Sequence, residues 1–206
     1  TKAVERIQRG SAHYAQRPDK SYGRLDPTRT SLQGWSEITQ FQRVSGRHWL
    51  WSISHKTDSV FFDTNDFATL NNADGIQPSA QITYRETRPG RFFRSYSIAL
   101  NQSWEWNFGW ERQTYQIRPN TTLTWKNFWT TTASYTTNES AADAHLTRGG
   151  PAMFRPKSWQ TQVTHANRTT AQTRWSGTMT LGGNDLGGST HRASRRDHCG
   201  TEARSR

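Results

Sequence analysis

The chain has 206 residues, a net charge of +11 and a hydrophobic fraction of only 31%, which is poor for a water-soluble core of this size. Its ten Trp, nine Phe and six Tyr exclude an ordinary disordered chain. No stretch approaches the roughly 18 consecutive apolar residues of a membrane-spanning helix, so an α-helical membrane protein is excluded as well. The cations are scattered singly along the chain, a pattern that argues against nucleic acid as a partner.

Residues 1–10 are polar and charged and contain no apolar core of a secretion signal. We interpret the chain as a fragment of a longer protein. We expect one domain over residues 1–189 and a basic, disordered tail over residues 190–206. The single Cys199 lies in that tail and is interpreted as an incidental thiol.

From Ser31 onward the sequence predicts successive antiparallel hairpins, because alternating segments are separated by turn residues such as Ser45-Gly46. Pro119 falls inside one predicted strand and indicates either a bulge or a place where the ladder of hydrogen bonds is relaxed. Residues 138–157 form the longest segment without strand character, and residues 182–188 are a glycine-rich loop. The predicted strands are residues 31–44, 47–56, 60–62, 76–87, 91–107, 110–125, 128–137, 158–165 and 169–181.

Residues 91–107 show the pattern most clearly, because side chains on a strand point alternately to opposite faces. One face is aromatic and apolar, and the other is small or polar. This arrangement suits a sheet that meets lipid on one side and water on the other, although a soluble β-protein also fits. We therefore predict an all-β fold, an antiparallel meander of long hairpins that forms a partial outer-membrane-type β-barrel. The predicted water-facing positions include Ser95, Ser97, Asn101, Ser103 and Glu105.

Two loops contain candidate binding residues. Asp63, Asn65, Asp66 and Asp74 supply the hard oxygen atoms that calcium prefers, but the spacing is not that of an EF-hand, and side-chain-to-backbone turns explain the same residues. Arg148, in the segment Thr147–Pro151, could bind a carboxylate or a phosphate. The sequence shows no metal-ligand spacing of His or Cys and no serine-hydrolase elbow, so it predicts no catalytic residues, no metal and no cofactor.

Several short motifs resemble a family of large bacterial outer-membrane proteins, in which a β-barrel domain of unknown function follows a carbohydrate-binding family-9-like module. The resemblance spans residues 11–181 and implies outer-membrane placement, but it implies no activity. The sugar-binding module is expected in the full-length protein and is absent here. The motifs are His13–Asp19, Leu25–Thr28, Thr30–Trp35, Ser45–Trp49, Asn65–Phe67 with Ala73-Asp74, Tyr84–Glu86, Lys126–Trp129 and Thr147–Pro151 with Arg155-Pro156.

These observations favour a non-enzymatic segment of an outer-membrane barrel that acts as a channel, a transporter or a surface platform. Its expected partner is outer-membrane lipid, with carbohydrate as a second candidate and no nucleic acid. Basic residues would point into the interior of the barrel or meet lipid phosphates at its rims. The alternatives are an enzyme of surface polysaccharide, which needs a pair of carboxylates in a cleft, and a sugar-binding sheet. Aromatic residues should form two belts in a barrel and one groove in a sugar binder.

Overall fold

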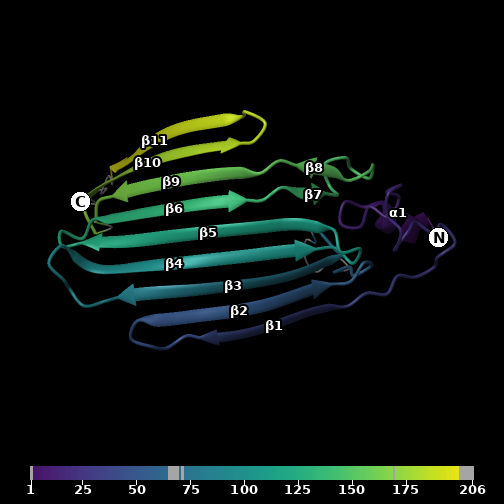
Figure 1. Ribbon diagram of the computed structural model, residues 1–206, viewed down its shortest axis with the longest axis horizontal. Helices are drawn as coiled ribbons and strands as arrows, with labels where there is room; N and C mark the ends of the chain where they lie inside the picture. The colour runs from purple at the N-terminus through teal and green to yellow at the C-terminus, as the bar shows by residue number, and fades with distance from the viewer. Residues whose placement is uncertain (1, 65–69, 71, 169, 200–206) are drawn as a thin grey trace, which may run out of the picture.

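The computed structural model describes residues 2–64, 70, 72–168 and 170–199, with side chains up to residue 194. Within this part, the chain is an all-β protein with one short helix, α1 (Lys2–Arg9), as Figure 1 shows. Gln8 of α1 is buried and exchanges two hydrogen bonds with the backbone of Asp26, at 2.9 and 2.8 Å. The helix therefore folds back onto the segment that follows it.

Nine strands form one antiparallel sheet in which neighbours in sequence are neighbours in space, apart from the short β7 and β8. The predicted meander is confirmed. The sheet does not close on itself, so β1 and β11 are its two edges, which is consistent with a partial barrel. Its strands are β1 (Ser36–Arg43), β2 (Trp49–Asp58), β3 (Gly75–Glu86), β4 (Phe93–Trp106), β5 (Arg112–Trp125), β6 (Thr130–Asn138), β9 (Ser158–Ala166), β10 (Thr173–Asn184) and β11 (Ser189–Cys199).

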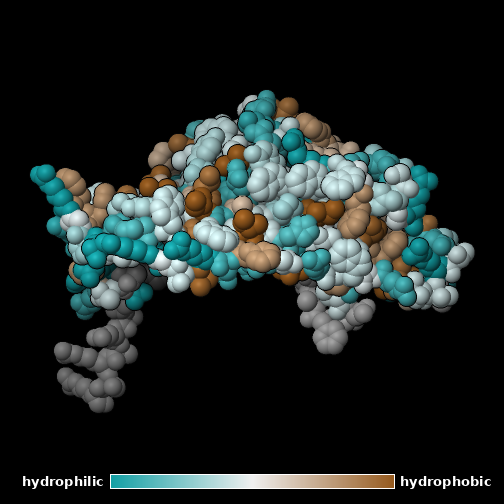
Figure 2. All heavy atoms as spheres, turned by 60° about the horizontal axis from the view of Figure 1, so that its bottom comes forward, coloured by the Kyte–Doolittle hydropathy of each residue, from teal (hydrophilic) through white to brown (hydrophobic). Residues whose placement is uncertain are grey.

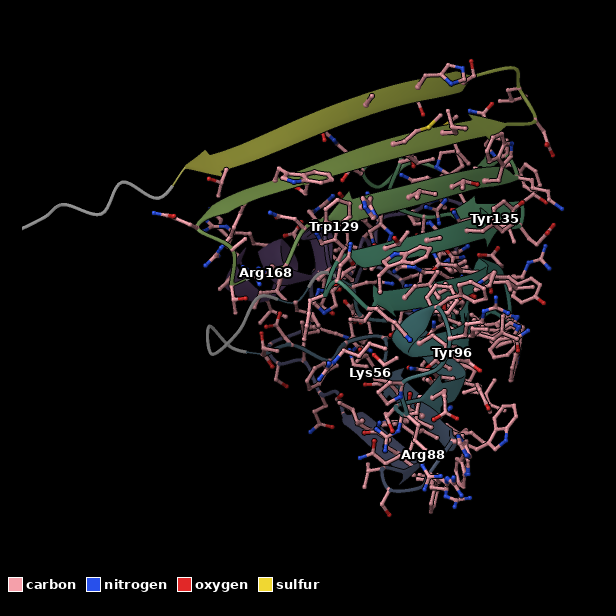
Figure 3. The ribbon with its side chains drawn as sticks, turned by 90° about the vertical axis from the view of Figure 1, so that its left-hand side faces the viewer. Lys56, Arg88, Tyr96, Trp129, Tyr135 and Arg168 are labelled. Carbon is pink, nitrogen blue, oxygen red and sulfur yellow. The ribbon has the colours of Figure 1, made fainter. Side chains whose placement is uncertain are left out.

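The strand register gives the sheet two chemically different faces. One row runs from Trp49 through Tyr84 and Ile98 across the sheet, and the next row runs from Leu50 through Thr83 and Ala99. Because facing residues share a side of the sheet, apolar residues fall together on one face and polar residues on the other. In Figure 3, which looks along the strands, Tyr96 and Tyr135 lie on one side of the sheet and Lys56 on the other.

Two prolines interrupt the ladder locally without ending a strand. The pairing of β5 with β6 stops after Ile117 and resumes at Asn120, on either side of Pro119. Pro78 sits in a similar gap between β3 and β4. Proline has no N–H to donate, so each gap reflects a missing hydrogen bond. This confirms the relaxed ladder predicted at Pro119, while the bulges lie elsewhere, near Phe93 and near Trp106.

Some boundaries differ from those predicted. The segment Val60–Phe62 is a turn and not a strand, and a hydrogen bond from Phe62 N–H to the carbonyl of Ser59 closes it at 3.0 Å. Residues 138–157 contain a small hairpin of β7 (Ala141–Asp143) and β8 (Met153–Arg155). Residues 189–199, which the sequence assigns mostly to a basic tail, pair along the whole free edge of β10. This strand forms through backbone pairing with β10, although its sequence has no alternating apolar pattern.

The two ends of the sheet are built differently. Loops 44–48, 87–92 and 126–129, together with residues 167, 168 and 170–172 between β9 and β10, lie at one end of the strands, which we call the hairpin end. The N-terminal segment, residues 2–34, lies at the opposite end together with β7 and β8, to the right in Figure 1. We call this the N-terminal end.

The described part of the chain has almost no apolar core. Its buried apolar residues are all alanines, whereas many large apolar side chains are exposed. Figure 2 shows such hydrophobic residues at the surface, among polar ones. Packing of large side chains therefore contributes little to this fold in water. The buried alanines are Ala15, Ala73, Ala99, Ala141 and Ala144.

Candidate functional site

Asp74 is the centre of a buried polar cluster at the N-terminal end. It directly follows a loop and has a positive φ of 65°, a conformation that Asp tolerates better than most residues. Its Oδ2 atom accepts a hydrogen bond from the Tyr22 hydroxyl and pairs with Lys20 Nζ, both at 2.8 Å. Its Oδ1 atom accepts the N–H of Phe108 at 3.0 Å. Burial and the Asp74 carboxylate raise the pKa of Tyr22 above its ordinary value.

Arg17 forms a second buried contact beside this cluster. Its guanidinium donates to both carboxylate oxygens of Asp19, at 3.1 and 2.8 Å, and lies 3.8 Å from Glu111. Burial acts to lower the pKa of Arg17, but these carboxylates outweigh it and raise the pKa. The hydrogen bond from Arg17 in turn lowers the pKa of Asp19. Asp19 also accepts the N–H of Ala152, so it ties the N-terminal segment to the loop before β8.

A small cavity of about 20 Å³ lies between these groups, lined by residues that include His13, Arg17, Asp74 and His145. A space of that size has room for a single water molecule. The described residues contain no group of three or more His, Cys, Asp or Glu that could hold a metal ion. The cluster is therefore a structural tie between the N-terminal segment and the loops, and it leaves no room for a substrate.

Of the sequence-predicted binding residues, Asp63, Asp74 and Arg148 lie in the described part of the chain. Asp74 is engaged with Lys20 and Tyr22, as above, while Asn65 and Asp66 lie outside the described residues. Asp63 is described and forms an interaction of its own. No finding tests these residues as calcium ligands, so that role stays a prediction.

Arg148 is exposed and has a positive φ of 52°. Its backbone N–H donates to the carbonyl of His145 at 3.1 Å. The neighbouring Gly149 lies against the side chain of Gln16, where an added Cβ atom would come within 2.3 Å of Gln16 Nε2. This loop therefore packs against the N-terminal segment through Gly149, and binding of an anion by Arg148 stays a prediction.

The polar face of the sheet has two broad hollows, of about 460 and 470 Å³. Cross-strand hydrogen bonds tie its side chains together, as between Ser54 and Ser79 at 2.7 Å and between Asn101 and Asn120 at 2.8 Å. The predicted water-facing residues of β4 all share this face, as their pairing partners in β5 show. The first hollow is lined by residues that include Ser52, Ser79, Gln81, Asn101, Ser103, Gln116, Arg118 and Asn120.

On the polar face, the carboxylate of Glu105 accepts hydrogen bonds from uncharged side chains. Gln77 and Asn72 donate to its Oε1 atom at 2.9 and 3.1 Å, and the Thr114 hydroxyl donates to Oε2 at 3.3 Å. The other carboxylate nearby, Asp58, forms an ion pair with Lys56 at 2.6 Å. Each of these carboxylates is therefore held in place by protein groups.

The opposite, apolar face carries most of its aromatic residues in two bands, one toward each end of the strands, while Trp51 and Tyr135 lie in the rows between them. At the hairpin end, ring contacts run from strand to strand, as between Trp49 and Tyr84 at 5.0 Å. At the other end, Trp104 of β4 stacks on Tyr115 of β5 at 5.8 Å, and Trp106 and Trp159 stand toward the same end of β4 and β9. Aliphatic residues such as Ile53, Ile82, Ile98, Val163 and Met179 lie between the bands and are exposed. The hairpin-end band consists of Trp49, Tyr84, Phe93, Tyr96, Trp125, Trp129 and Trp175.

The features of this site that sequence reasoning missed are the buried Arg17 and Lys20 and the half-buried Tyr22. They stand in a polar, irregular segment, where no periodicity marks a residue as buried. Asp74 is 54 and 52 positions away from Lys20 and Tyr22, and only the fold brings them together. Of the three, only Arg17 lies within the motif of residues 13–19, one of those that carry the family resemblance.

Taken together, the fold and the two faces define a class: an antiparallel β-meander with one exposed aromatic and aliphatic face and one polar face. The chain belongs to the family of a domain of unknown function, DUF5916, whose model matches residues 3–181. Searches of curated proteins and of solved structures gave no significant match. No helix in the described part of the chain is long and apolar enough to cross a membrane.

Proposed function

We propose that this chain forms part of the wall of a bacterial outer-membrane β-barrel and acts without catalysis, as a channel, a transporter or a surface platform. The observation that carries the proposal is the exposed apolar face, with aliphatic residues between two aromatic bands. Membrane barrels have an outer surface of this kind. Along each of their strands, polar residues that face the interior alternate with the apolar residues that face lipid. In water the same face would be a large unfavourable apolar surface.

The distribution of aromatic residues also separates this proposal from a sugar-binding sheet. A sugar binder would gather its aromatic rings in one groove, but the first hollow of the polar face is lined by Ser, Gln, Asn, Ala and Arg and the second includes a single aromatic residue, Trp104. The lining of the first hollow offers hydrogen bonds to a hydroxyl-rich solute without a surface for stacking. Carbohydrate is thus the alternative partner, as a solute that passes along this face. A sugar-binding module elsewhere in the full-length protein would supply tight binding.

Adjacent residues of β4 provide the test. Ile98 lies on the apolar face and is 51% exposed, whereas Ser97 lies on the polar face. We would remove the single cysteine by Cys199→Ser, introduce Ile98→Cys or Ser97→Cys, attach a nitroxide label and refold the chain in micelles or lipid vesicles. Oxygen, which dissolves in lipid, should relax the label at 98, and a water-soluble nickel chelate should relax the label at 97. Equal access of the chelate to both labels would contradict the proposal.

A further inference from the structure

The hairpin end of the sheet carries a dense set of exposed cations. They come from all four loops at this end and from the strand residues beside them, and no ion pair found among the described residues includes any of them. Arg88 and Arg168, from two different loops, are labelled in Figure 3, which looks onto this end. We call this set the basic rim: Arg43, Arg47, Arg88, Arg91, Arg94, Lys126, Arg168 and Arg174.

Acidic residues are nearly absent from the same end. Within the four hairpin-end loops and the strand residues beside them in β1–β10, Glu86 is the only carboxylate. It lies 3.5 Å from the His48 ring and accepts the N–H of Arg88 at 2.8 Å. At the N-terminal end, by contrast, carboxylates pair with cations, as Asp74 does with Lys20, Asp143 with Arg155 and Glu139 with Lys157. The excess positive charge is therefore confined to one end of the strands.

The basic rim is interleaved with exposed aromatic residues. The guanidinium of Arg94 lies 4.4 Å from the centre of the Phe128 ring, and that of Arg91 lies 5.2 Å from the centre of Phe92. Phe92 is 63% exposed and Phe128 is 49% exposed, and both stand beside the hairpin-end aromatic band. Aromatic and basic residues at one level are typical of the boundary between lipid tails and headgroups. Cation–π contact keeps the guanidinium groups at that level.

We propose that the basic rim binds the phosphate groups of an anionic lipid headgroup layer, so that the hairpin end of this chain contacts the anionic surface of the membrane. This inference rests on the proposed function and adds an orientation and a ligand to it. Guanidinium groups match phosphate in charge and in hydrogen-bonding geometry. The opposite end, where cations and carboxylates neutralise one another, has no such surface among the described residues.

The experiment is co-flotation of the micelle-refolded chain with vesicles of phosphatidylcholine, with or without phosphatidylglycerol, at low and at high salt. The unaltered chain should bind the anionic vesicles more tightly, and high salt should weaken the preference. The variant Arg88→Gln/Arg91→Gln/Arg94→Gln removes three rim cations. Each cation near an anionic surface is worth roughly fivefold in binding, so we expect a loss on the order of a hundredfold.

A matched control removes the same charge from the N-terminal end. Lys2, Arg6 and Arg24 are exposed, and no ion pair found among the described residues includes them. The variant Lys2→Gln/Arg6→Gln/Arg24→Gln should therefore keep the preference for anionic vesicles. An equal loss in both variants would show that net charge matters and not the rim, and would overturn the inference. Should the rim variant fail to refold, the single change Arg91→Gln and the salt titration of the unaltered chain decide the question.

The outcomes separate this inference from the barrel proposal. Equal insertion into neutral and anionic vesicles would overturn the headgroup site but would not contradict the barrel proposal. Flotation with anionic vesicles that weakens at high salt would support the headgroup site. If the nickel chelate also reached both nitroxide positions of β4, the barrel proposal would be contradicted. If the chain bound a single-stranded RNA in the absence of lipid, and the rim variant lost that binding, the rim would be a nucleic-acid site and the inference would be overturned.

Discussion

Asp74 is the residue on which the N-terminal end of the molecule converges. One of its carboxylate oxygens holds Lys20 and Tyr22, and the other holds the backbone of the loop after β4. A buried cation is costly unless it is paired, so each partner depends on the other. With only alanines buried among the apolar residues, this polar contact replaces the apolar packing that would usually fix such a segment.

This dependence gives a prediction for Asp74→Asn. Asn tolerates the positive φ of this position, so the main effect is the loss of charge opposite Lys20. We expect a destabilisation of about 3–5 kcal/mol, because a buried ammonium group loses its partner. Tyr22→Phe removes one hydrogen bond and should cost about 1 kcal/mol. Urea unfolding of both variants in micelles measures the difference. Equal destabilisation by the two changes would mean that the ion pair does not hold the segment.

The candidate binding residues show how far sequence alone reaches at this scale. The cluster of Asp and Asn predicts a loop whose carboxylates bind a cation, and Asp74 forms an ion pair with the ammonium group of Lys20. Whether Asp74 pairs with a metal ion or with an ammonium group depends on which side chain the fold places beside it. Lys20 lies in a segment without a periodic pattern, so its position beside Asp74 could not be predicted from the sequence. The face of each β4 residue, by contrast, follows from alternation alone.

At the scale of elements, alternation predicts strands well and fails where backbone pairing alone makes the strand. The residues of β4 and β5 alternate strongly, and their predicted strands differ from the observed ones by two residues at most. β11 shows no alternation but pairs with β10 over its full length. Val60–Phe62 shows the opposite case, in which a short apolar run forms a turn because Phe62 bonds back to Ser59. Hydrogen-bond partners, and not side-chain pattern, decide such segments.

Glycines give a prediction at the same scale, for the loop between β7 and β8. Gly149 has a φ of 102° and touches Gln16 of the N-terminal segment, so Gly149→Ala is strained and displaces that side chain. We expect a loss of more than about 1 kcal/mol and faster trypsin cleavage of the N-terminal segment. Gly177→Ala is the matched control, because nothing lies within 4 Å of the added Cβ atom. Equal cleavage rates in the two variants would show that this loop does not secure the segment.

The whole molecule is a sheet whose two faces need different surroundings. Its amphipathic character follows from sequence, because aromatic alternation sets the faces and low hydrophobicity excludes a large core. The extent of the sheet, its open edges and the N-terminal segment at one end depend on pairing between distant residues, which composition does not encode. The charge asymmetry between the two ends is likewise invisible until loops far apart in the chain are placed side by side.

This division of faces predicts how the whole chain responds to its solvent. In water, burial of alanines alone offers little stabilisation, and two open strand edges invite association, so we expect aggregation and no cooperative unfolding. In micelles, detergent covers the apolar face, and we expect a β-type circular dichroism spectrum with a cooperative thermal transition. Unheated samples should also migrate differently from heated ones on a gel. A cooperative transition of equal midpoint without detergent would contradict the membrane proposal, because an exposed apolar face of this size would then be stable in water.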